Sequence, residues 1–115
     1  MKWFLAKIVF RIICGDGKHM PQFDEQLRLI TADDEESAIT KACRLGEAEQ
    51  DCFYNERKQL VQWKFIGVPE LILLHELSDG AEIYSRINEV DNGDQYVSNI
   101  RKKTYTLFSN QLTVA

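Results

Sequence analysis

The sequence predicts an α+β fold, a mostly antiparallel sheet of about five strands in the order β-β-α-β-β-β-α with helices packed on one face. Two observations predict this class. Residues 23–46 pass from an alternating, strand-like segment directly into a capped helix, and the flanking segments also alternate apolar and polar residues. The helix has a narrow apolar face of small residues, which is typical of a helix lying close against a sheet.

The composition fits one small globular domain. The chain has 115 residues, of which 44% are hydrophobic and 28% charged, and its formal net charge is −4. This length suffices for a core without disulfides or metals. We expect residues 1–103 to form a single α+β domain and residues 104–115 to add a C-terminal strand or a loose tail. The negative charge argues against nucleic acid and anionic membranes as partners.

The cysteines and the apolar N-terminal segment indicate where in the cell the protein is expected. Cys14, Cys43 and Cys52 are odd in number and lack CxxC spacing, which predicts free thiols in a reducing cytoplasm. Lys7 and Arg11 interrupt the apolar N-terminal stretch, and no small-residue cleavage site follows it. We therefore expect a cytoplasmic protein with no membrane span.

The first two strands are predicted to pair. Residues 3–14 are apolar on both faces, which favours a central strand. Residues 15–21 are rich in turn formers, so residues 23–32 are expected to return antiparallel beside the first strand. In this second strand the odd-numbered residues, which include Leu27 and Leu29, are predicted to form the buried face, and the even-numbered residues the polar face. The buried set is Phe23, Leu27 and Leu29, interrupted by Glu25; the polar set is Gln22, Asp24, Gln26 and Arg28.

The helix that follows has recognisable ends. Asp33 or Asp34 is expected to be the N-cap, whose carboxylate accepts from the free backbone N–H groups of the first turn. Five residues fall on one helical face: Ala38, Ile39, Ala42, Cys43 and Leu45. Gly46 is a plausible residue just beyond the C-terminus, although residues 47–50 could continue another turn.

The C-terminal half is predicted to hold three more strands and a helix. Residues 59–68 form the third strand, which Pro69 closes or kinks because proline cannot donate to a ladder. Residues 71–77 and 81–90 are expected to form a hairpin around a tight turn. Residues 95–103 have helical spacing and end in three basic residues, the sign that favours a helix C-terminus.

An ordered set of motifs resembles a known family. The matching stretches are Trp3-Phe4-x-Ala6-Lys7, Phe23-Asp24-Glu25-Gln26-x-Arg28-Leu29-Ile30-x-Ala32, Asp34-Glu35-x-x-Ala38-x-x-Lys41-Ala42-x-x-Leu45-Gly46, Trp63-Lys64-Phe65-x-Gly67-Val68 and Leu77-x-Asp79-Gly80-x-Glu82-Ile83-x-Ser85-Arg86. Together they resemble the small, mostly bacterial proteins known as domain of unknown function 4288, over roughly residues 3–90. The resemblance implies a bacterial-type, single-domain protein and carries no assigned activity.

Four charged residues are candidates for ligand binding. Glu25, Arg28, Glu82 and Arg86 could anchor a small molecule in a pocket between sheet and helix. For Glu25 the alternative is a cross-strand ion pair, with Lys7 or Arg11 as its partner, or Arg28 if the two faces of the strand are assigned wrongly. This simpler interpretation is the favoured one.

The sequence contains no convincing catalytic, metal or cofactor motif. His75 and Glu76 lie near Glu82 in the expected hairpin, but no HxH or HxxxH spacing supports a metal site. Cys43 and Ser85 have no histidine partner that the sequence identifies. We expect no catalytic residue, no metal and no cofactor.

The favoured function is predicted from apolar strand faces that the expected helix does not cover. Residues 3–14 and 71–77 are apolar on both faces, and one helix of small residues covers only one face of a sheet. The favoured prediction is a non-enzymatic protein–protein interaction module that acts as a homodimer, with another protein as a possible partner. The alternative is a small-molecule-binding or enzymatic α+β domain with a pocket between sheet and helix.

Overall fold

The chain forms two compact units. The computed structural model describes residues 1–113. The first unit spans residues 1–84 and the second begins at Ser85.

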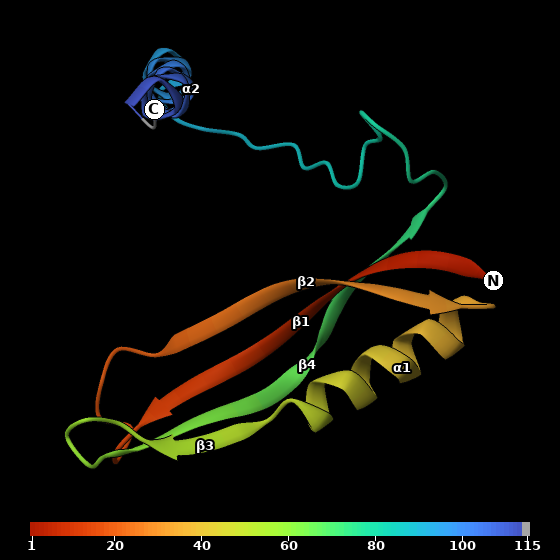
Figure 1. Ribbon diagram of the computed structural model, residues 1–115, viewed down its shortest axis with the longest axis vertical. Helices are drawn as coiled ribbons and strands as arrows, with labels where there is room; N and C mark the ends of the chain where they lie inside the picture. Colours follow the sequence, from red (N-terminus) through yellow and green to blue (C-terminus); the bar gives the residue numbers. More distant parts are fainter. Residues whose placement is uncertain (114–115) are drawn as a thin grey trace. The chain divides into compact units, whose positions relative to one another are not determined.

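The first unit is a four-stranded antiparallel sheet with one helix on it (Figure 1). Its strands are β1 (Lys2–Cys14), β2 (Gln22–Ala32), β3 (Asp51–Tyr54) and β4 (Leu60–Leu74), arranged in the order β2-β1-β4-β3. Helix α1 (Glu35–Ala48) lies across one face, which we call the inner face; the opposite face is the outer face. The α+β class and the antiparallel pairing of the first two strands are confirmed.

The strand count differs from the prediction of five. The third and fourth predicted strands are one strand, β4, which runs through Pro69. Its pairing with β1 shifts register between Val9–Gly67 and Lys7–Glu70, so Pro69 lies at an irregularity where a ladder tolerates a residue without an N–H. Residues 81–90, predicted as the fifth strand, contain no strand, and the short β3 was not expected.

The core lies between the inner face and α1. Its central cluster consists of Phe4, Ala6, Ile30, Ala38 and Ala42, all nearly or fully buried. Two alanines bring the helix close to the strands, as predicted, whereas Ile39, predicted for the same face, is exposed. A row of larger side chains would hold the helix further from the sheet.

The ends of α1 follow local chemistry. Asp34 is the N-cap, and its Oδ1 accepts a hydrogen bond from the backbone N–H of Ser37 at 2.7 Å. Gly46 does not terminate the helix as expected: α1 continues to Ala48, and Gly46 is buried against the ring of Phe65. A side chain at position 46 would collide with that ring, so the glycine serves packing rather than termination.

The two faces of β2 are the reverse of those predicted. Ile30 pairs with Phe4 and packs under α1, which fixes the parity of the whole strand. The predicted buried set therefore lies on the outer face, where Phe23, Leu27 and Leu29 are 53%, 51% and 53% exposed. A one-residue change of parity moves every side chain of a strand to the other face.

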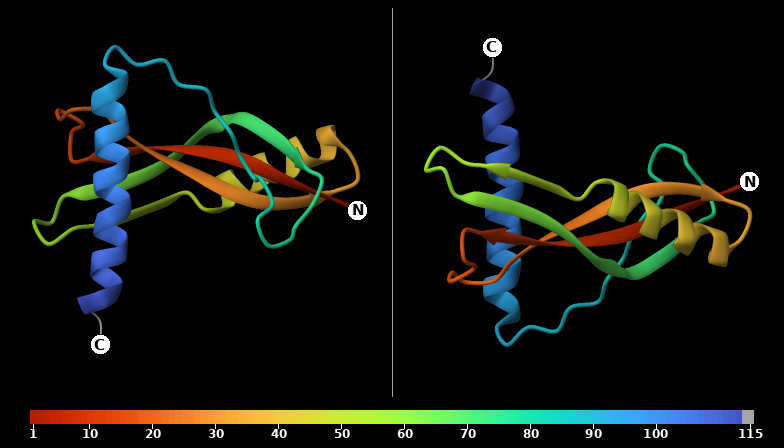
Figure 2. Two further views of the ribbon diagram at one scale, coloured as in Figure 1. Left: turned by 90° about the horizontal axis from the view of Figure 1, so that it is seen from above. Right: turned by 90° about the horizontal axis from the view of Figure 1, so that it is seen from below.

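The chain after β4 returns over the other side of the sheet. Residues 75–84 contain no helix or strand. In both views of Figure 2, this segment and α1 lie on opposite sides of the sheet. Leu5 and Leu74, both on the outer face by their pairing, are nearly buried.

The second unit contains α2 (Gly93–Thr113), which is longer than the helix expected over residues 95–103. Residues 104–113, expected as strand or tail, continue this helix, and residues 114–115 of that expectation lie outside the described residues. Exposed apolar side chains follow helical spacing along it: Tyr96, Val97, Ile100, Leu107 and Phe108. Within residues 1–113, no helix is both long enough and apolar enough to cross a membrane.

Candidate functional site

A chain of hydrogen-bonded polar side chains covers the inner face of β2. Asp24 Oδ2 accepts from Trp63 Nε1 at 3.1 Å and from Gln26 Nε2 at 2.7 Å. Arg28 Nη1 donates to Gln26 Oε1 at 3.0 Å, and both Nη atoms of Arg28 donate to the carboxylate of Glu49, at 2.6 and 2.8 Å. We call these five residues the polar ladder. It links β4, β2 and the end of α1, and its polar groups are already partnered.

The Arg28–Glu49 pair of the polar ladder is a salt bridge that shifts the pKa values of both side chains. The two hydrogen bonds from the Arg28 guanidinium hold the pKa of Glu49 below its ordinary value, and those bonds raise the pKa of Arg28. Both side chains are about one-third exposed, so solvent screens the pair. The pair ties the C-terminal end of α1 to β2.

Removing this pair is expected to make stability less dependent on pH. Because folding lowers the pKa of Glu49, the pair stabilises the fold above the ordinary carboxyl range, and this contribution is lost as pH falls through the lowered value. We expect Glu49→Gln to lose about 0.5 kcal/mol at about pH 7 and less at about pH 3, where a larger share of Glu49 is protonated. Urea denaturation at the two pH values measures this. The exposed Glu47, replaced by glutamine, is the matched control; equal losses in the two variants would contradict the assignment.

The outer face carries a small charged cluster centred on Lys7 of β1. Lys7 Nζ lies 3.5 Å from Glu25 Oε1 and 3.9 Å from Glu70 Oε2. The latter oxygen is buried and accepts no hydrogen bond. Arg11, the other partner considered for Glu25, instead lies over the ring of Phe23, 5.6 Å from its centroid. Glu25 therefore forms the cross-strand ion pair with Lys7.

The four ligand-binding candidates are spread over the molecule. Glu25 lies on the outer face of β2 and Arg28 on the inner face, so these two side chains leave the strand in opposite directions. Glu82 is exposed in residues 75–84. Arg86 belongs to the second unit, where its Nε donates to Asn88 Oδ1 at 2.9 Å. Ligand binding by these residues remains a prediction.

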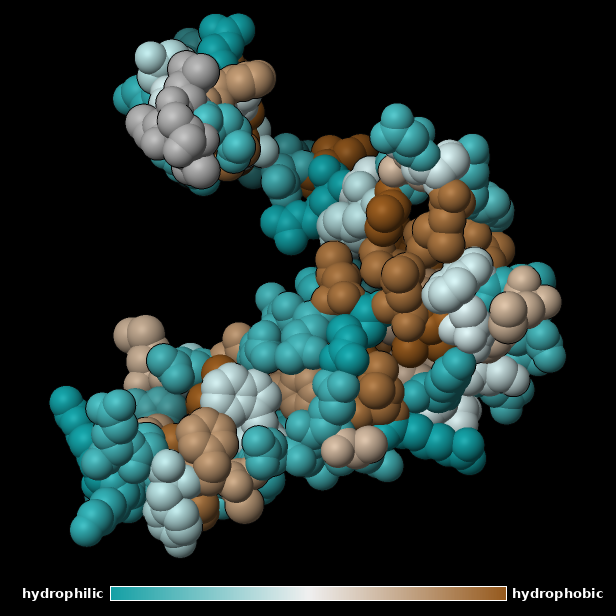
Figure 3. All heavy atoms as spheres, in the orientation of Figure 1, coloured by the Kyte–Doolittle hydropathy of each residue, from teal (hydrophilic) through white to brown (hydrophobic). Residues whose placement is uncertain are grey.

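Three apolar residues of β2 lie in one row on the outer face, and Glu25 interrupts the row. Phe23, Leu27 and Leu29, which we call the outer stripe, pair with Arg11, Lys7 and Leu5 of β1. Apolar side chains gather on the surface where β2 crosses β1 and where β4 ends (Figure 3). Leu5 on β1 is buried, whereas the outer stripe at the sheet edge is half-exposed. The sequence signal was the broken alternation at Ile30 and Ala32, which places these two residues, not the leucines, on the helix side.

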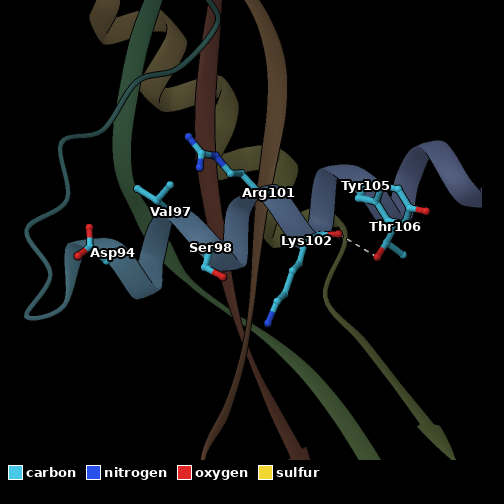
Figure 4. A pocket seen from close by; sticks show the side chains of 7 residues that line it. All are labelled: Asp94, Val97, Ser98, Arg101, Lys102, Tyr105 and Thr106. Carbon is cyan, nitrogen blue, oxygen red and sulfur yellow. Dashed lines mark hydrogen bonds between the residues drawn. The ribbon is translucent and has the colours of Figure 1, made fainter.

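A groove beside α2 is not a closed binding site within its unit. Its lining side chains are Asp94, Val97, Ser98, Arg101, Lys102, Tyr105 and Thr106. All of them project from this one helix (Figure 4). Thr106 Oγ1 hydrogen-bonds the carbonyl of Lys102, which leaves that hydroxyl engaged with its own backbone. Among residues 1–113, no three His, Cys, Asp or Glu side chains gather closely enough to hold a metal ion.

The fold defines the class: a small α+β domain in which one helix covers one face of a four-stranded antiparallel sheet. The chain belongs to the family described as Domain of unknown function (DUF4288), whose model matches residues 3–85. That match confirms the resemblance seen in the sequence and coincides closely with the first unit. No curated protein and no solved structure matches the chain.

Proposed function

We propose that this protein is a non-enzymatic protein–protein interaction module that acts as a homodimer through the outer stripe of β2. The observation that carries the proposal is the half-exposure of three large apolar side chains, Phe23, Leu27 and Leu29, on one face of one strand. Single exposed apolar residues are ordinary, whereas several on one face of one strand favour a contact surface, here with the Glu25–Lys7 ion pair among them. Burying such side chains contributes about 25 cal/mol per Å² of apolar surface.

The remaining surfaces of the first unit support the same proposal. The polar groups of the polar ladder are bonded to one another, so they are not presented to a ligand. The centre of the layer between sheet and helix is filled by Ala38, Ala42 and the contact of Gly46 with Phe65. A pocket between sheet and helix, the alternative considered above, would have to use the hollow at one end of that layer, which is lined by Lys2, Phe4, Glu35, Leu71 and Leu73.

Light scattering coupled to size exclusion, over a series of protein concentrations, tests the proposal. The full chain is expected to have twice the mass of one chain, and Leu27→Glu is expected to have the mass of one. Because Leu27 is half-exposed, this change should alter the stability of the monomer by no more than about 0.5 kcal/mol.

Ile39→Glu is the matched control, because Ile39 is a 42% exposed apolar residue on α1, away from the outer stripe. This variant should remain a dimer. A monomeric parent protein, or a dimer that survives Leu27→Glu, would contradict the proposal.

A further inference from the structure

The outer edge of β2 is a long strand edge without a partner strand. β2 is the terminal strand of the sheet and is eleven residues long, whereas the other terminal strand, β3, has four. No strand within residues 1–113 pairs with this outer edge. Unpaired backbone N–H and C=O groups along such an edge are a template for another strand.

One end of this edge is already occupied. Lys41 Nζ, from α1, donates to the backbone carbonyl of Thr31 at 3.0 Å and to its Oγ1 at 3.1 Å. A lysine at this place is one of the ways in which proteins protect a strand edge. The edge that remains runs over residues 22–30, and its midpoint is Gln26.

The charges of β2 are complementary to a second copy running antiparallel. Two acids, Asp24 and Glu25, lie on one side of the midpoint, and Arg28 lies on the other. Pairing about Gln26 sets Asp24 opposite Arg28 of the second copy and Phe23 opposite Leu29. Pairing about Glu25 or about Arg28 would set like charges directly opposite one another, which is destabilising. Parallel, in-register pairing would align every charge with its own copy.

We propose that a second copy of this chain docks on β2 by antiparallel β2–β2 pairing across a two-fold axis at Gln26. This inference rests on the proposed homodimer and specifies how the dimer is built. The pairing continues the sheet through both copies and leaves both α1 helices on the same face. It also brings the two outer stripes side by side, which doubles the apolar row.

Cysteine cross-linking tests the position of the axis. In full-length protein with Cys14, Cys43 and Cys52 replaced by serine, a cysteine is introduced by Gln26→Cys. Directly opposed residues of antiparallel strands have Cα atoms about 4.5–5.5 Å apart, within the range of a disulfide. Under mild oxidation, most of the Gln26→Cys protein is expected to migrate as a covalent dimer on a denaturing gel. Adding reductant should return it to the monomer position.

Gln22→Cys is the control, since Gln22 is an exposed glutamine of the same strand and the same parity. In the proposed pairing the two Gln22 positions are eight residues apart along the strands, about 27 Å, so this variant should not cross-link. Equal cross-linking of both variants would overturn the inference.

Light scattering on the same serine background separates the two proposals. A dimer in which Gln26→Cys does not cross-link would overturn β2–β2 pairing and leave the homodimer standing on another surface. A monomer at every concentration would overturn the homodimer itself.

Discussion

Replacing Phe10 with alanine is expected to lower the free energy of unfolding by about 3–5 kcal/mol. Phe10 is 1% exposed on the inner face of β1 and is one of the largest fully buried side chains. Its ring meets that of Phe65 edge-on, with centroids 6.1 Å apart and planes at 63°. Domains of this size have stabilities of about 5–15 kcal/mol, so the loss would be a large fraction of the total.

Urea denaturation of Phe10→Ala and Phe53→Ala provides the measurement and its control. Phe53 is also an aromatic residue of the sheet and stacks on Trp63 at 6.2 Å, but it is 44% exposed. Its replacement is expected to cost only about 1 kcal/mol, because less apolar surface returns to water. A similar loss in the two variants would show that burial at Phe10 does not control the stability of the sheet.

Replacing Gly46 with alanine is expected to destabilise the protein by about 1–3 kcal/mol. Helix propensity alone predicts the opposite sign, since alanine is favoured over glycine in a helix interior by about 1 kcal/mol. The new methyl group would collide with the ring of Phe65 across the inner face. Packing therefore decides the outcome, and thermal or urea denaturation measures it.

A second substitution separates the collision from other effects of Gly46→Ala. In a Phe65→Leu background the ring is absent, and Gly46→Ala is expected to become neutral or mildly stabilising. Gly67→Ala is the control for a change of glycine to alanine without a neighbour, since nothing lies within 4 Å of a Cβ added there. Destabilisation by Gly46→Ala that persists without the ring would contradict the packing explanation.

Local signals were sufficient for the elements that depend on local chemistry. The cap at Asp34 and the antiparallel return of β2 follow from residues close together in sequence. The buried face of β2 could not be predicted in this way, because Leu27 and Leu29 indicated one face whereas Ile30 and Ala32 pack under α1 on the other. Alternation in a strand predicts two faces, but the contact with the helix decides which one is covered.

The predicted fifth strand does not form, although an edge of β4 was open to it. Residues 81–90 alternate well enough to form a strand, and a tight turn precedes them. β1 pairs with β4 as far as Leu74, whereas β3 pairs only with Leu60–Trp63. The second edge of β4 beyond Trp63 therefore has no partner strand within residues 1–113, yet residues 81–90 do not join it. Alternation in the sequence predicts that a segment can form a strand, but not that it will pair.

The polar ladder could not be predicted for a related reason. Arg28 and Glu49 are 21 residues apart, and Asp24 and Trp63 are 39 residues apart. Nothing in their spacing indicates that they meet. Glu25, by contrast, could be assigned to a cross-strand pair from the charges of the neighbouring strand, and its partner, Lys7, is one of the three considered.

The central place of β1 has a consequence for synthesis on the ribosome. β2 follows β1 closely, but the other edge of β1 pairs with β4, from Cys14 with Val61 to Trp3 with Leu74. At elongation rates of about 5–20 residues per second, that edge waits several seconds for its partner. β1, a strongly apolar strand, is thus left half-paired for several seconds in the nascent chain. Binding by a holdase chaperone during translation would matter most in that interval.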